Sequence, residues 1–255
     1  MLNNPTIEKL QSLRLAGMVN AFTSQLNDPK MSALSFDERF GLIVDEEELL
    51  RINKRMQSRI RQAKFKEQAC FEDIEFNPAR GLDKSFLKTL ATSKWIDQGF
   101  NLIVTGACGV GKTYIATALA HKACRKGLRS LFLRVPRLFD EIEASRADGS
   151  YPRFMAKLAK IDALILDDWG LSKLTARQSR DVLEIIEDRH QSKSTIITSQ
   201  LPVDKWYELI EDPTIADALF DRILHNSYKL ELRGPSLRKE HSKLTRKVKV
   251  SDDKK

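Results

Sequence analysis

A strand, a glycine loop and a helix follow one another in the middle of the chain, and this arrangement constrains the fold most strongly. Residues 106–113 read Gly-Ala-Cys-Gly-Val-Gly-Lys-Thr, which fits G-x-x-x-x-G-K-[ST] at every fixed position. An apolar run (100–105) precedes the loop, and an alanine-rich helical segment (114–125) follows it. Glycines let consecutive backbone N–H groups surround phosphate oxygens, and the helix N-terminus adds partial positive charge. The sequence therefore predicts a nucleoside triphosphate site.

Two side chains of this loop have expected roles of their own. Lys112 is expected to reach the β- and γ-phosphates, and the Thr113 hydroxyl to ligate Mg²⁺. A glycine turn without a ligand is the alternative, but the flanking strand and helix favour a site for ATP and Mg²⁺. The expected nucleotide-binding residues of the loop are Gly106, Ala107, Cys108, Gly109, Val110, Gly111, Lys112, Thr113 and Tyr114.

A second apolar run, at 162–168, ends in two carboxylates. If this run is a strand beside the strand of the glycine loop, Asp167 is placed to hold the Mg²⁺ shell. Asp168 is then free to polarise the water that attacks the γ-phosphate. A strand followed by a polar turn is the alternative reading of the same residues.

Five apolar runs alternate with helical sequence in the rest of the chain, which is typical of an α/β fold with a mostly parallel sheet between helices. The runs are 102–105, 130–134, 163–166, 195–199 and 228–232.

The first 68 residues read as helices only. Thr6 is a plausible N-cap for a helix over 7–26. Ser35 and Glu38 have the spacing of a capping box that starts a helix over 36–66. We therefore expect a small all-α N-terminal domain (1–68) for DNA or partner binding and assembly, a nucleotide-binding core (69–245) and a charged, disordered tail (246–255).

The net charge of +8 favours a polyanionic partner, most simply nucleic acid. The three cysteines have no C-x-x-C spacing, so neither a disulfide framework nor a zinc site is expected. No signal peptide is visible, and no run approaches the roughly 18 apolar residues of a membrane span. These features predict a cytoplasmic protein that does not bind a membrane.

Three further polar residues are candidates for the site. Gln200 follows the run 195–199 and can contact the γ-phosphate or the attacking water if that strand lies between the two preceding ones. A strand-end cap is its alternative role. Arg222 can stabilise charge on the γ-phosphate of a neighbouring subunit, or form a local ion pair. Arg238, at the end of the segment 234–238, is a further candidate.

These elements, in this order, resemble the AAA+ ATPases over about residues 71–244, and within them the initiator and helicase-loader branch. The chain is most similar there to IstB-type helper ATPases of bacterial insertion sequences, which are related to the helicase loader DnaC. The segments that carry the resemblance are 13–18, 34–39, 106–113, 166–170 and 198–202.

The resemblance implies an AAA+ core in which ATP lies between subunits of a ring or helical oligomer. Gln200 takes the first sensor position, where close relatives carry Asn or Asp. Arg222 is then the arginine finger, and Arg238 the second sensor, which touches the nucleotide of its own subunit. The expected catalytic residues are Lys112, Asp167, Asp168, Gln200 and Arg222.

The implied function is that of an ATPase that hydrolyses ATP to ADP and phosphate, assembles on target DNA and recruits or stimulates a cognate transposase. A DnaC-like replicative helicase loader is the alternative. An inert nucleotide pocket is disfavoured by the intact Lys112, Thr113, Asp167 and Asp168. A small-molecule kinase is disfavoured because the sequence shows no evident lid or acceptor-substrate site.

The segment 134–160 is longer than one strand-to-strand crossover requires, with a break at 148–152. In the initiator branch, an extra helical insertion here tracks the DNA backbone. The alternative for this segment is a solvent-exposed loop whose charge is balanced by Asp140, Glu141 and Glu143. For the basic residues of the helix over 36–66, the alternative is a solvated helix with ion pairs such as Glu47 with Arg51. Contacts to phosphates of double-stranded DNA, without sequence preference, are expected from Arg55, Arg59, Arg134, Arg137, Arg146, Arg153, Lys157, Lys160, Lys173, Arg177 and Arg180.

Overall fold

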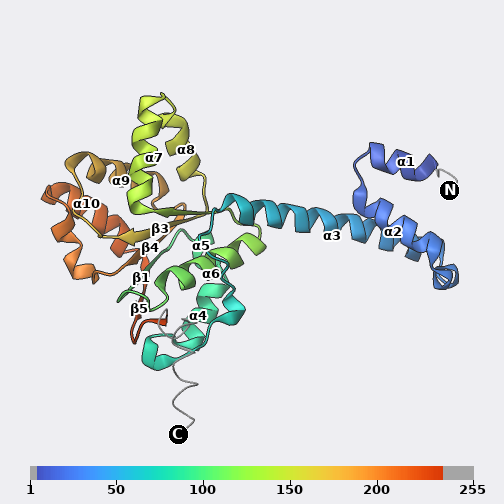
Figure 1. Ribbon diagram of the computed structural model, residues 1–255, viewed down its shortest axis with the longest axis horizontal. Helices are drawn as coiled ribbons and strands as arrows, with labels where there is room; N and C mark the ends of the chain where they lie inside the picture. Colours follow the sequence, from blue (N-terminus) through green and yellow to red (C-terminus); the bar gives the residue numbers. More distant parts are fainter. Residues whose placement is uncertain (1–4, 238–255) are drawn as a thin grey trace, which may run out of the picture. The chain divides into compact units, whose positions relative to one another are not determined.

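The computed structural model of the chain describes residues 5–237 (Figure 1). The chain divides into two compact units, Met1–Ser58 and Arg59–Lys255. The boundary lies earlier than the predicted one at residue 68, because the residues after Ser58 pack with the nucleotide-binding core. The backbone N–H of Phe132 donates to the Ala63 carbonyl at 2.8 Å, and Ala63 is fully buried.

The first unit is helical, as predicted, but its first helix is split. It contains α1 (Pro5–Ser12), α2 (Ala16–Asn27), a 3-10 turn (Pro29–Ala33) and most of α3 (Phe36–Gln62). The expected single helix over 7–26 is interrupted because Arg14 has φ 59°, a left-handed conformation that an α-helix does not continue through.

The predicted capping box at the start of α3 is confirmed. Glu38 Oε2 accepts a hydrogen bond from the Ser35 backbone N–H at 2.8 Å, and the Glu38 N–H donates to Ser35 Oγ at 3.3 Å. This reciprocal pair fixes the start of the helix, because it satisfies backbone N–H groups that have no partner within the first turn.

Helices α2 and α3 approach each other closely at Gly17. A Cβ atom on Gly17 would lie 2.5 Å from Glu47 Cα. The buried Glu47 carboxylate accepts hydrogen bonds through Oε2 from the N–H groups of Gly17 (2.6 Å) and Met18 (3.2 Å). Its other oxygen accepts a hydrogen bond from Arg51 Nε at 2.7 Å. This bond is the main cause that lowers the Glu47 pKa, and the hydrogen bonds from the α2 backbone lower it further. Glu47 thus joins the two helices.

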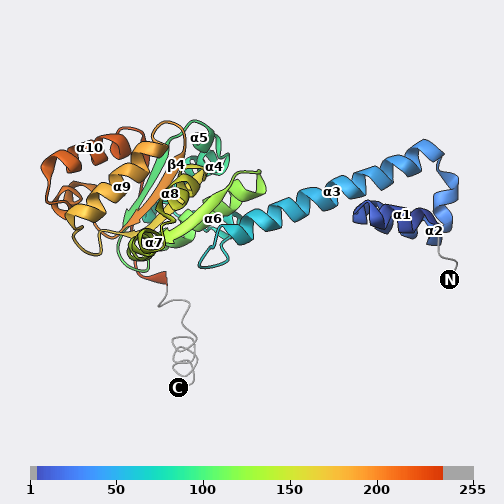
Figure 2. The same cartoon turned by 90° about the horizontal axis from the view of Figure 1, so that it is seen from above.

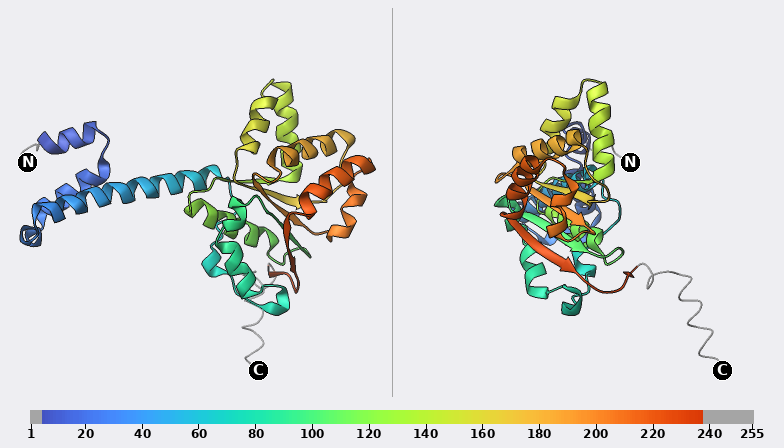
Figure 3. Two further views of the ribbon diagram at one scale, coloured as in Figure 1. Left: turned by 180° about the vertical axis from the view of Figure 1, so that it is seen from behind. Right: turned by 90° about the vertical axis from the view of Figure 1, so that its left-hand side faces the viewer.

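The second unit contains a five-stranded sheet in which every pairing is parallel, and this confirms the predicted sheet (Figure 3). The strand order is β2-β3-β4-β1-β5, so β4 lies between β1 and β3. All five strands end at the same edge of the sheet, because they run in the same direction. The strands are β1 (Asn101–Gly106), β2 (Ser130–Arg134), β3 (Ala163–Trp169), β4 (Ser194–Ser199) and β5 (Ser227–Leu232).

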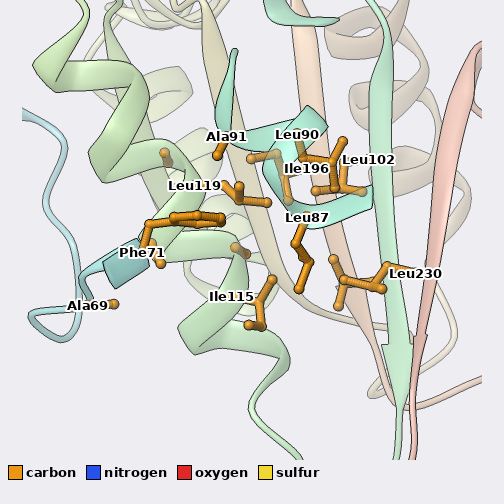
Figure 4. Packing of buried hydrophobic residues seen from close by; sticks show 14 of the residues in the cluster. Ala69, Phe71, Leu87, Leu90, Ala91, Leu102, Ile115, Leu119, Ile196 and Leu230 are labelled. Atoms are coloured by element: carbon orange, nitrogen blue, oxygen red, sulfur yellow. The ribbon is translucent and has the colours of Figure 1, made fainter. Parts of the chain in front are cut away.

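Successive residues of β1 face two different cores. Leu102 and Val104 pack with the cluster that contains α4 and α6, as Figure 4 shows for Leu102. Ile103 packs with the cluster that contains α7, α8, α9 and α10. The sheet is therefore covered by helices on both faces (Figure 2).

Residues 84–97 form two helices and not one, since Ser93 has φ 60°. No described helix has both the length and the apolar character needed to cross a membrane. The helices of the second unit are α4 (Lys84–Ala91), α5 (Lys94–Asp97), α6 (Lys112–Arg125), α7 (Val135–Ala147), α8 (Tyr151–Ala159), α9 (Ala176–Arg189) and α10 (Pro213–Leu224), and its 3-10 turns are Phe71–Asp73, Pro78–Arg80, Val203–Lys205 and Tyr207–Leu209.

The close approach at Gly17 makes a prediction. Gly17→Ala should destabilise the N-terminal unit by roughly 2 kcal/mol, because the added methyl group meets backbone atoms of α3. The loss of stability should be measured as faster hydrogen–deuterium exchange of backbone amides over residues 5–58. Gly41→Ala is the matched control, because Gly41 also lies in a helix but its added Cβ has nothing within 4 Å. Equal exchange in the two variants would contradict the close contact.

Candidate nucleotide-binding site

The glycine loop links the end of β1 to the start of α6 at the carboxyl edge of the sheet. Gly106, Gly109 and Gly111 have φ values of 145°, 82° and 100°, a region that favours glycine. Within residues 5–237, the backbone N–H groups of 107–111 donate no hydrogen bond to another protein group. A row of N–H donors without protein acceptors, placed at a helix N-terminus, fits the phosphate chain of a nucleotide.

Lys112 is the first residue of α6, and its side chain turns back to the loop. Its Nζ donates to the carbonyls of Gly106 and Ala107, each at 2.8 Å. Only 8% of Lys112 is exposed. These contacts keep the ammonium group at the loop, where it can neutralise phosphate charge.

The Asp167 carboxylate lies at the centre of the site. Its Oδ1 accepts hydrogen bonds from Thr113 Oγ1 at 2.8 Å and from Thr198 Oγ1 at 2.6 Å. Asp167 is 1% exposed, so these bonds compensate the cost of burying a carboxylate. A Thr hydroxyl and an Asp carboxylate are oxygen ligands that suit Mg²⁺. Among the described residues, no group of three or more Asp, Glu, His or Cys side chains is placed so that it could hold a metal ion.

The strand order explains which residues meet at Asp167. The condition set for Gln200 is met, since β4 pairs with both β1 and β3. The condition set for Asp167, that its strand lies beside the strand of the glycine loop, is not met, because β4 separates β3 from β1 and its Thr198 donates to Asp167. Sequence reasoning missed Thr198, although it precedes Gln200 by two residues in a run that ends in polar residues. Gln200 itself is exposed just beyond β4 and has no hydrogen-bond partner in the described part of the chain.

Asp168 is held by an arginine from the end of β2. Arg134 Nη2 and Nε lie 2.7 and 2.9 Å from the same oxygen, Oδ2 of Asp168. The Asp168 backbone has φ 64° and donates its N–H to Thr198 Oγ1 at 3.2 Å. Arg134, which the sequence suggested as a DNA contact, is therefore paired inside the nucleotide site.

Arg222 lies away from the phosphate loop of its own chain. It occupies the last turn of α10, where Nη1 donates to the Ala218 carbonyl at 2.7 Å and Nη2 lies 3.0 Å from Glu187 Oε1. A short turn connects the end of α10 to the start of β5, so Arg222 lies near the amino edge of the sheet. Arg238 lies outside the described residues.

Two segments distant in sequence also contact the phosphate loop. The Leu237 N–H donates to the Gly109 carbonyl at 3.0 Å, and Ser236 Oγ would lie 2.1 Å from a Cβ on Gly109. Arg80 Nη2 donates to the Val110 carbonyl at 3.1 Å. Sequence reasoning did not identify Arg80 as a contact of the loop.

The predicted DNA contacts fall into two groups. In the first group, Arg134, Arg146 and Arg59 have partners within the protein. Both terminal nitrogens of Arg146 pair with the Asp181 carboxylate, at 3.0 and 2.5 Å. Arg59 Nε donates to the Cys124 carbonyl at 3.1 Å. The break predicted at 148–152 separates α7 from α8. The others are exposed and have no ion-pair partner among residues 5–237: Arg55, Arg137, Arg153, Lys157, Lys160, Lys173, Arg177 and Arg180.

Together, the helix-covered parallel sheet with β4 between β1 and β3, the glycine loop and the buried aspartate define an AAA+ P-loop core. The family described as IstB-like ATP binding protein matches residues 8–245, and the chain belongs to this family.

Known relatives match nearly the whole chain. A Sinorhizobium fredii protein named as an insertion sequence ATP-binding protein is 44% identical over 94% of this chain and 98% of its own length. A Pseudomonas fluorescens protein, named as the ATP-binding protein of insertion sequence IS1162, is 47% identical over 79% of this chain and 88% of its own. Among solved structures, the DnaC helicase loader matches with a TM-score of 0.55 and 20% identity over 65% of this chain and 97% of that chain.

The contact at Gly109 predicts how the loop responds to substitution. Gly109→Ala should weaken binding of a fluorescent ATP analogue about tenfold or more, since φ 82° strains an alanine and its methyl group meets Ser236. Gly127→Ala is the control. Gly127 follows α6 with φ 99°, and nothing lies within 4 Å of an added Cβ. The Gly127→Ala variant should be less stable but should keep its affinity for the ATP analogue. Similar affinities of the Gly109→Ala and Gly127→Ala variants would refute the prediction.

Proposed function

We propose that this protein is an ATP-dependent, DNA-binding helper ATPase of insertion-sequence transposition. It hydrolyses ATP to ADP and phosphate, assembles on double-stranded target DNA and recruits or stimulates a cognate transposase. The observation that carries the proposal is the Thr113–Asp167–Thr198 arrangement beside the phosphate loop. Family membership over residues 8–245 supports a role in transposition.

The hydrolytic step follows from the side chains at the carboxyl edge. Lys112 neutralises charge on the β- and γ-phosphates. Thr113 and Asp167 would hold Mg²⁺, which would supply positive charge at the phosphate oxygens. Arg134 contacts only Oδ2 of Asp168, so Oδ1 can accept a proton from the attacking water. The water oxygen bonds to the γ-phosphorus as the bond to the β–γ bridging oxygen breaks.

A second subunit completes this site in the proposal. Arg222 lies near the amino edge of the sheet, whereas the phosphate loop of the same chain lies at the carboxyl edge. In the proposal, Arg222 therefore serves as the arginine finger for a neighbouring subunit in a ring or helical oligomer. Arg238, which lies outside the described residues, is proposed as the second sensor of the same subunit, and the residue before it, Leu237, donates its N–H to the Gly109 carbonyl. Gln200, at the end of β4, acts as the first sensor.

DNA is proposed to bind through the exposed cations of the second unit. Arg153 and Lys157 are four residues apart on α8, and Lys160 follows the helix end. Guanidinium and ammonium groups without protein partners suit phosphates, and phosphate contacts carry no sequence information. The likeness to the DnaC helicase loader concerns the fold alone at 20% identity, whereas the family match extends through the N-terminal unit. This favours the transposition role over helicase loading.

Two substitutions separate binding from hydrolysis. Lys112→Ala should abolish nucleotide-dependent assembly and DNA-stimulated ATPase activity, since it removes the charge that holds the phosphates. Asp168→Asn should keep ATP affinity within a few-fold and slow hydrolysis by about 10²–10⁴-fold, as expected for loss of a general base. Steady-state phosphate release and a nucleotide-binding assay measure both effects. A wild-type protein that is a monomeric ATPase, indifferent to DNA, would overturn the proposal.

The DNA surface is tested by charge removal. The triple variant Arg153→Gln, Lys157→Gln, Lys160→Gln should weaken binding to DNA duplexes of different sequence by similar factors. Its slope of log affinity against log salt should be shallower by about 0.9 for each phosphate that the variant no longer neutralises. The control replaces three exposed cations elsewhere on this unit, Lys88, Lys94 and Lys229, with Gln. Equal weakening in both triples would show that only net charge matters and would remove α8 from the proposal.

A further inference from the structure

An arginine that precedes β1, outside the phosphate-binding motif, reaches the phosphate loop with its side chain. Arg80 is the last residue of the 3-10 turn Pro78–Arg80, which is capped by the Asn77 side chain through a hydrogen bond from the Ala79 N–H at 3.0 Å. The Arg80 carbonyl accepts a hydrogen bond from the N–H of Arg233, just after β5, at 3.0 Å. The turn is therefore tied to the end of an edge strand, and this fixes the Arg80 backbone.

The Arg80 side chain has few partners for a guanidinium group. Its Nη2 donates to the Val110 carbonyl at 3.1 Å. Within residues 5–237, its Nε is buried without an acceptor, and no carboxylate forms an ion pair with it. The stem of the side chain packs on Gly234, since a Cβ on Gly234 would lie 3.6 Å from Arg80 Cγ. A buried donor without an acceptor costs stability, so packing alone does not account for this position.

The hydrogen bond to Val110 determines where the next N–H group of the loop points. The described chain has no cis peptide bond, and in a trans peptide the C=O and N–H groups point in opposite directions. A donor on the Val110 carbonyl therefore directs the Gly111 N–H away from Arg80. The Leu237 N–H, which donates to the Gly109 carbonyl at 3.0 Å, directs the Val110 N–H in the same way. In the described part of the chain, both N–H groups belong to the row that has no protein acceptor.

The Val110–Gly111 peptide needs such a constraint because glycine allows it to rotate. Gly111 has φ 100°, and glycine populates positive and negative φ about equally, so rotation of this peptide costs little. Rotation would turn the carbonyl oxygen toward the phosphates in place of the N–H. Arg80 opposes the rotation by holding the carbonyl. Its positive charge also polarises the peptide, which makes the N–H a stronger donor.

We propose that Arg80 is a positioning residue for phosphate binding, which holds the Val110–Gly111 peptide so that the Gly111 N–H faces the phosphate chain of the nucleotide. The inference rests on the nucleotide site of the proposed function and adds a residue from outside its motif. Because Arg80 acts through the loop, its effect concerns the phosphate chain and not the base or the ribose. The N–H contact is present before and during hydrolysis, so its loss should raise KM and leave kcat nearly unchanged.

The experiment compares three variants of the full chain. Arg80→Met keeps the apolar stem that packs on Gly234 but removes the donor and the charge, whereas Arg80→Lys keeps a donor and the charge. Arg233→Met is the matched control, because Arg233 is an exposed arginine whose side chain pairs with Glu231. Affinity is measured by displacement of a fluorescent ATP analogue, once with ATP and once with inorganic tripolyphosphate, which has neither base nor ribose. Steady-state phosphate release gives KM and kcat, and circular dichroism gives the melting temperature.

Arg80→Met should weaken the binding of ATP and of tripolyphosphate by the same factor, about tenfold, and should raise KM by that factor with kcat within about twofold. Arg80→Lys should recover most of the affinity, and Arg233→Met should bind like the wild type.

Four results would overturn the inference. Weaker ATP binding with unchanged tripolyphosphate binding would place Arg80 at the base or the ribose, and unchanged binding of both would remove its role. Equal losses in Arg80→Met and Arg233→Met would show an effect of net charge. Equal losses in Arg80→Met and Arg80→Lys, with equally lowered melting temperatures, would show a purely structural role. A wild type that does not bind the analogue would instead refute the nucleotide site itself, and the inference with it.

Discussion

The buried carboxylate of Asp167 is the group on which the nucleotide site depends. Placing a carboxylate in the interior costs several kcal/mol unless hydrogen bonds compensate it. Thr113 at the start of α6 and Thr198 at the end of β4 both donate to one of its oxygens, so three elements are fixed relative to one another. The same arrangement places a carboxylate and a hydroxyl next to the phosphate loop, as a Mg²⁺-nucleotide requires. Stability and the proposed binding of a Mg²⁺-nucleotide thus rest on the same side chains.

Around this centre, the site is assembled from segments that are far apart in the chain. Arg80 contacts the phosphate loop from before β1, and Leu237 contacts it from after β5. Arg134, from β2, holds Asp168. Movement of any of these segments would displace the phosphate loop or Asp168 directly. Arg222 is the exception, since it lies near the amino edge of the sheet, and this position suits a role toward a neighbouring subunit.

The N-terminal unit has a different physical character. Among its described residues, only Gly17, Gln25 and Glu47 are buried, so it has almost no apolar core of its own. Polar contacts through Glu47 join α2 to α3, while Leu42, Leu49 and Ile52 of α3 remain exposed.

The sequence by itself determined the phosphate loop, the paired aspartates, the five strands and the capping box of α3. Each of these is a local pattern, in which residues close in the chain have a fixed geometry. Only the tertiary structure decided that Thr198 bridges β1 and β3, that Arg134 pairs with Asp168 and that Arg14 splits the first helix. It also showed which side of α3 is left exposed. These facts depend on strand order and helix packing, and the free energies that select them come from contacts between residues far apart in the sequence.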